Sequence, residues 1–127
     1  MRPFALLLAV ALVIASAGCA AQPAGTIGAA ALQAELRTDT VQLIDVRTPD
    51  EWSRGHIEGA VHIDWFSDEF KAQVEKLDKN APVRLYCAAG GRSEEAREML
   101  RGMGFRDVLD LDGGIGAWKK SGGAVVK

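Results

Sequence analysis

Cysteine and histidine are scarce in this sequence, and long runs of basic residues are absent. The 127 residues include only two cysteines, Cys19 and Cys87, and only two histidines, His56 and His62. Two cysteines allow at most one disulfide. The histidines lie six residues apart with no third ligand placed nearby, which argues against a metal site. Without a basic run, nucleic-acid binding and polybasic membrane contact are not expected.

The overall composition is that of one globular domain. Hydrophobic residues make up 48% of the chain and charged residues 25%, with a net charge of −2. A chain of this length and composition can bury a core, and its charge content argues against global disorder. No internal repeat or long low-complexity segment interrupts it.

The first eighteen residues have the pattern of an export signal. Arg2 supplies a positive start, and the apolar run 4–15 that follows is too short for a comfortable transmembrane helix. The run ends Ser16-Ala17-Gly18-Cys19, which resembles the lipobox of bacterial lipoproteins. We therefore expect residues 1–18 to be a signal peptide and Cys19 to be lipidated, placing the protein in the periplasm or cell envelope with a membrane anchor.

Ordinary cleavage after Ala17 is the alternative at this junction. A lipobox usually has Leu three residues before its cysteine, where this chain has Ser16. If Cys19 stayed unmodified, it could form a disulfide with Cys87 in an oxidising compartment. Residues 19–25 are small and uncharged and include Pro23 and Gly25, which predicts a flexible tether before a domain over 26–127.

Strand and helix patterns alternate through this domain. Apolar runs predict strands near residues 26–27, 41–46, 61–63, 83–87 and 108–111. Helical spacing predicts helices near 30–36, 70–79 and 93–103, and the turn 112–114 leads into a final helix that contains Trp118. Such alternation indicates an α/β fold with a central parallel sheet and helices on both faces. Trp65, Phe66 and Phe70 are expected in the core, and Ser93 is expected to cap its helix.

Cys87 is the candidate nucleophile. It ends an apolar strand and is followed by Gly90-Gly91 and a helix, so the unpaired N–H groups of the helix start would favour its thiolate. The glycines let successive N–H groups converge on one anionic atom. The residues expected to form this anion-binding loop are Ala88, Ala89, Gly90, Gly91, Arg92 and Ser93. The alternative is a buried cysteine that acts only as a small hydrophobic residue.

Three polar residues could support this site. Asp45 and Arg47 follow the strand at 41–46, and ligands in parallel α/β sheets bind beyond the carboxyl ends of strands. His56 precedes the short strand at 61–63. For Asp45 and Arg47, a structural hydrogen bond or ion pair that fixes the loop is the favoured reading.

Four segments resemble the motifs of single-domain rhodaneses, in that family's order. They are Leu43 to Trp52, Gly55 to Ile63, Tyr86 to Ser93 and Leu111 to Trp118. The resemblance covers about Thr26 to Lys120. It implies the three-layer rhodanese-like fold, with a parallel sheet of about five strands, and no cofactor.

The resemblance also implies sulfur transfer through Cys87. Its thiolate would take the sulfane sulfur of thiosulfate or a similar small sulfur donor, store it as a persulfide and pass it to cyanide or a thiol. Arg92 would steer or hold an anionic donor, unless it serves only as a salt bridge. Related phosphatases and arsenate reductases use five residues between cysteine and arginine, whereas four separate Cys87 from Arg92. A persulfide carrier or docking module that turns over small donors poorly remains open, because Ala88 and Ala89 replace the polar residues common in the family.

Overall fold

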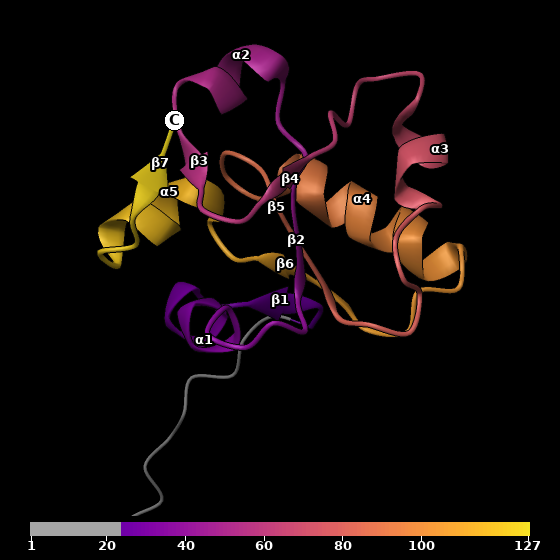
Figure 1. Ribbon diagram of the computed structural model, residues 1–127, viewed down its shortest axis with the longest axis horizontal. Helices are drawn as coiled ribbons and strands as arrows, with labels where there is room; N and C mark the ends of the chain where they lie inside the picture. Colours follow the sequence, from indigo (N-terminus) through magenta and orange to yellow (C-terminus); the bar gives the residue numbers. More distant parts are fainter. Residues whose placement is uncertain (1–23) are drawn as a thin grey trace, which may run out of the picture.

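The central layer of the molecule is a five-stranded parallel sheet. The structure, a computed structural model, describes residues 24–127. The strand order is β1-β6-β5-β2-β4, with every pair parallel (Figure 1). The strands are β1 (Thr26–Ile27), β2 (Gln42–Asp45), β4 (Val61–His62), β5 (Val83–Tyr86) and β6 (Val108–Leu111). The predicted fold class is thus confirmed.

Helices cover both faces of the sheet. They are α1 (Ala29–Glu35), α2 (Pro49–Ser53), α3 (Phe70–Val74), α4 (Gly91–Gly102) and α5 (Gly114–Lys120). One core cluster lies under α3 and α4 and includes Ile44, Leu85 and Leu100 (Figure 1). The other lies under α1 and α5 and includes Leu32 and Trp118. The two-sided core explains why the central strands read as nearly unbroken apolar runs.

A second, two-stranded sheet joins β3 (His56–Ile57) to β7 (Val125–Val126) in antiparallel register. This pair brings the C-terminal strand beside α5 and the β3 segment (Figure 1). The sequence analysis did not predict it, because the pairing joins two short segments that lie far apart in the chain, and local pattern does not report such a contact.

Three local predictions were wrong. The helix predicted over 70–79 spans only Phe70–Val74. Phe66 was expected in the core but is 65% exposed. Ser93 does not cap α4, since the N-cap is Gly90, whose φ of 124° is a conformation that L side chains rarely adopt.

The central strand β5 carries one buried charge. All four of its residues are buried, and Arg84 is only 4% exposed. Its guanidinium bonds Glu35 on α1 and Asp107 before β6, at 2.7 Å and 2.9 Å. Two partners compensate the desolvation of the charge, and the contacts connect α1 to the sheet.

Candidate functional site

The candidate site lies where β5 ends and α4 begins. Cys87 directly follows β5, is 2% exposed, and is the free cysteine of the described residues. The backbone N–H of Gly90 donates to its Sγ at 3.0 Å, and Ser93 Oγ lies 3.5 Å from the same sulfur. The loop therefore turns a backbone donor and a hydroxyl toward one buried sulfur.

These contacts favour the thiolate. Burial raises the pKa of the Cys87 thiol, because it removes water from the charged form. The hydroxyl of Ser93 and the backbone N–H groups of Ser93, Gly90 and Ala89 act in the opposite direction and outweigh burial. The net pKa of the Cys87 thiol lies below its ordinary value, as a nucleophile requires.

The junction between β6 and α5 packs against the backbone of this loop. The Ile115 N–H donates to the Cys87 carbonyl at 2.9 Å. Gly114 has a φ of 59°, and a Cβ there would lie 2.5 Å from both the Cys87 and Ala88 carbonyl oxygens. Only glycine permits this approach, so α5 packs directly on the backbone that carries the nucleophile.

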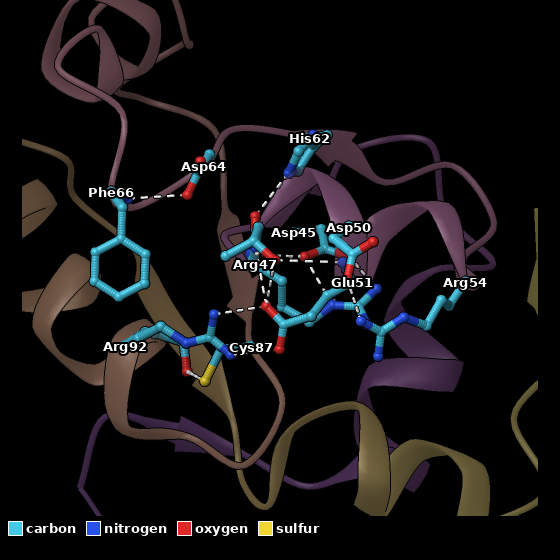
Figure 2. Close-up of polar contacts among 12 residues, drawn as sticks. Asp45, Arg47, Asp50, Glu51, Arg54, His62, Asp64, Phe66, Cys87 and Arg92 are labelled. Carbon is cyan, nitrogen blue, oxygen red and sulfur yellow. Dashed lines mark hydrogen bonds and ion pairs between the residues drawn. The ribbon is translucent and has the colours of Figure 1, made fainter.

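Arg92 lies beside Cys87 but is already paired (Figure 2). Its guanidinium donates two hydrogen bonds to the Glu51 carboxylate, at 2.7 Å and 2.9 Å. Phe66 stands against it, with its ring centroid 5.9 Å from the guanidinium carbon. Hydrogen bonding to Glu51, and secondarily the nearby Cys87 sulfur, raises the pKa of Arg92. The salt-bridge alternative for Arg92 is therefore the contact that the structure shows.

Glu51 was not among the predicted site residues. Its Oε2 accepts from the Thr48 N–H and hydroxyl, each at 3.0 Å, which completes a capping box at the start of α2. The T-P-D-E sequence predicts the helix start, but Glu51 and Arg92 are 41 positions apart in the chain and no local pattern signals their contact. The carboxylate thereby couples α2 to the active loop.

Asp45 and Arg47 form an ion pair with each other. Arg47 Nη2 lies 2.7 Å from Asp45 Oδ2 and donates at 2.7 Å to the Gly55 carbonyl. Both residues are buried, and the Arg47 guanidinium carbon is 5.7 Å from the centroid of the Tyr86 ring. Tyr86 in turn accepts from the Ile57 N–H at 3.0 Å. This network fixes the strand ends that precede the site.

The two histidines lie on either side of Trp52. His56 stacks on its ring at a centroid distance of 3.5 Å, and His62 stacks at 4.9 Å. His62 Nε2 is also 2.7 Å from the Arg47 carbonyl (Figure 2). Among residues 24–127, no group of three or more acidic, cysteine or histidine side chains could hold a metal ion. The support predicted for His56 stays a prediction.

Comparison with known proteins decides the family. The sequence model of the rhodanese-like domain family matches residues 28–121 of this chain. The chain belongs to the family of rhodanese-like domains. A protein of Ectopseudomonas mendocina named thiosulfate sulfurtransferase GlpE is 34% identical over 85 residues, which cover 67% of this chain and 76% of the relative.

Solved rhodanese-like structures have the same fold. A rhodanese-related protein of Thermoplasma volcanium matches with a TM-score of 0.71 and 31% identity, covering 80% of this chain and 96% of that one. A rhodanese-like domain protein of Staphylococcus aureus gives 0.69 and 30%, covering 80% and 98%. The family resemblance inferred from the four motifs is confirmed.

Proposed function

We propose that this rhodanese-like domain is a sulfurtransferase that forms a persulfide on Cys87. The observation that carries the proposal is the buried Cys87 sulfur, which receives the Gly90 N–H at 3.0 Å at the start of α4. A loop that stabilises one anionic sulfur also suits the anionic outer sulfur of a persulfide. The relative named thiosulfate sulfurtransferase supports thiosulfate as a donor to test first.

The reaction has two balanced steps. The Cys87 thiolate attacks the sulfane sulfur of thiosulfate, a new S–S bond forms, and sulfite leaves with the electrons of the old bond. Cyanide or a thiolate then attacks the outer sulfur and releases the Cys87 thiolate. Because negative charge develops on sulfur in both steps, the N–H donors of the loop stabilise both transition states.

The direct test is thiocyanate formation by the purified full-length protein from thiosulfate and cyanide. Cys87→Ser should abolish it, and Cys19→Ser, which removes the other cysteine, should leave it unchanged. Mass spectrometry after thiosulfate alone should show one added sulfur on the peptide containing Cys87. Thiocyanate formation at the parental rate by Cys87→Ser would overturn the assignment of the nucleophile.

A persulfide carrier is the second candidate, favoured by the Arg92–Glu51 pair. With both outer nitrogens of Arg92 bonded to Glu51, little cationic surface remains to bind a small dianion. The two residues that follow the nucleophile, Ala88 and Ala89, have apolar side chains. A stable added sulfur on Cys87 with negligible thiocyanate would favour the carrier. Cys87-dependent hydrolysis of an aryl phosphate would instead favour the phosphatase reading.

Export and lipid anchoring are proposed from the sequence alone. The signal peptide predicted at 1–18, Cys19 and most of the tether lie outside the described residues. Within residues 24–127, no helix is long and apolar enough to cross a membrane. A lipid on Cys19 would therefore hold the domain at the membrane by its N-terminal end.

A further inference from the structure

A buried polar cluster formed by Ser93, Arg97 and Asp110 joins the active loop to β6. Asp110, in β6, is 2% exposed, and Ser93 is fully buried. Ser93 Oγ lies 3.1 Å from Asp110 Oδ2, while Arg97 Nη1 bonds the other carboxylate oxygen. The cluster thus reaches from α4 and β6 to the Cys87 sulfur through one hydroxyl.

That hydroxyl has one hydrogen and three neighbours that can accept it. They are the Gly90 carbonyl and the Asp110 carboxylate, each at 3.1 Å, and the Cys87 sulfur at 3.5 Å. A carbonyl and an ionised carboxylate can only accept, and charge strengthens the bond to a carboxylate. While Asp110 is ionised, it competes with the sulfur for the Ser93 hydrogen.

We propose that Asp110 is a positioning residue that decides, through Ser93, whether the Cys87 sulfur receives the Ser93 hydroxyl hydrogen. With an ionised carboxylate, Ser93 donates to Asp110 and offers its lone pairs to the Cys87 thiol. When the thiol proton passes to Ser93 Oγ and the Ser93 proton passes to Asp110 Oδ2, a thiolate and a neutral carboxyl result. The neutral carboxyl then donates to Ser93, which donates to sulfur.

The surroundings of Asp110 act on the pKa of its carboxyl in opposite directions. Burial raises the pKa of its carboxyl, and the Arg97 guanidinium opposes that rise. The charged groups that act on it are Arg97 and Glu94 on α4, and the residue paired with it on β1 is the uncharged Thr26. The titratable Cys87 is linked to it only through Ser93. A cavity of about 340 Å³ borders this carboxyl, and its lining includes Arg97, Glu94, Thr26 and Asp112.

This role of Asp110 matters for catalysis only if the proposed function is right, but the test measures the Cys87 pKa and needs no sulfur transfer. The full-length protein with Cys19→Ala has Cys87 as its only cysteine. In this background, the Cys87 pKa is measured from thiolate absorbance and from the pH dependence of iodoacetamide alkylation. The variants are Asp110→Asn, Ser93→Ala and their combination. Asp112→Asn is the matched control, since it removes one charge from an exposed residue of the same segment.

Asp110→Asn should lower the pKa of the Cys87 thiol by about one unit, because the amide donates to Ser93 and frees its hydrogen for sulfur. In the Ser93→Ala background, the same substitution should shift the pKa by less than half as much. Asp112→Asn should leave it unchanged. Equal shifts with and without Ser93 would show a simple charge effect, and no shift in either background would also overturn the proposal.

Removal of the carboxylate leaves Arg97 without its buried partner, so the variant could fail to fold. Asp110→Leu combined with Arg97→Met replaces both members of the pair by apolar groups, which buried ion pairs often tolerate. This double variant should also lower the thiol pKa, and only when Ser93 is present. An unchanged pKa in a folded double variant would overturn the proposal, whereas loss of thiocyanate formation alone would bear only on the proposed function.

Discussion

One carboxylate, that of Glu51, stabilises two parts of the site. It caps α2 through Thr48 and binds Arg92 of the active loop, and its side chain is 25% exposed. The hydrogen bond from Arg92 is the main reason that the pKa of Glu51 falls from 4.5 to about 2. A carboxyl whose pKa is lowered by folding contributes stability above its unfolded pKa and loses it as the pH falls through its folded pKa.

Glu51→Gln should therefore destabilise the protein at neutral pH and progressively less in acid. We expect the difference in unfolding free energy from the parent to be constant above about pH 5 and to shrink as the pH falls toward about 2. Urea unfolding at a series of pH values measures it. Glu75→Gln, which removes an exposed partner of Lys79, should show little difference at any pH. A pH-independent loss in Glu51→Gln would contradict the role of the ion pair.

The same substitution tests donor selection. Glutamine can still accept a hydrogen bond from Thr48, but it lacks the negative charge that pairs with Arg92. We expect kcat/KM for thiosulfate to rise roughly tenfold relative to that for an uncharged organic polysulfide, since about 1.4 kcal/mol of released attraction gives that factor. Glu75→Gln serves again as the control. If both donors change by the same factor, Glu51 does not govern the charge preference of the site.

At the scale of secondary-structure elements, the junction between β6 and α5 supports the active loop. Gly114→Ala would place a methyl group 2.5 Å from the Cys87 and Ala88 carbonyl oxygens, and at a φ of 59°. We expect a loss of about 1–3 kcal/mol of stability from overpacking, together with a large fall in persulfide formation as the loop shifts. Urea unfolding and mass spectrometry of the persulfide measure the two effects.

Gly122→Ala separates backbone strain from the collision. Gly122 has a φ of 85°, but a Cβ there would meet nothing within 4 Å. This variant should lose some stability and keep full persulfide formation. Loss of persulfide formation in both variants would mean that the close contact at Gly114 is not what positions the Cys87 loop.

The elements differed in how well the sequence predicted them. The runs that form β2, β5 and β6 were recognised because buried parallel strands are apolar throughout, and the position of Cys87 at the end of β5 followed from them. Ser93 was misassigned as a helix cap because α4 begins two residues earlier, at Gly91. Its hydroxyl instead bonds the Gly90 carbonyl and Asp110, which is 17 residues away. Local sequence rules describe bonds between residues close in the chain, whereas the bond between Ser93 and Asp110 joins two elements of the folded structure.

The same limit applies to Arg92. Its place in the loop suggested either an anion-binding side chain or a salt bridge, but not that its partner would be Glu51 of α2. The two segments meet only because β2 and β5 are adjacent and parallel, so that their following loops emerge on one edge of the sheet. The strand order determines which side chains meet there, and periodicity along the chain does not report strand order.

At the scale of the whole molecule, the second cysteine of the sequence lies outside the described residues. It is Cys19, within the N-terminal segment. In an oxidising compartment an unmodified Cys19 could form a disulfide with Cys87 and block the nucleophile. A lipid on Cys19 would remove that thiol, so the proposed anchor would also protect the reactivity of Cys87.

Metabolic labelling with a radioactive fatty acid tests this link in bacteria that express the full chain. The parent and Cys87→Ser should both carry label and fractionate with membranes, whereas Cys19→Ala should carry none and be released. Without an anchor, the parent should instead be cleaved after Ala17 and stay unlabelled. Free-thiol titration of such unlabelled protein then shows whether Cys87 is blocked. A disulfide between Cys19 and Cys87 would leave no titratable thiol. Cys19→Ala should restore one thiol, because it removes the only other cysteine with which Cys87 can pair.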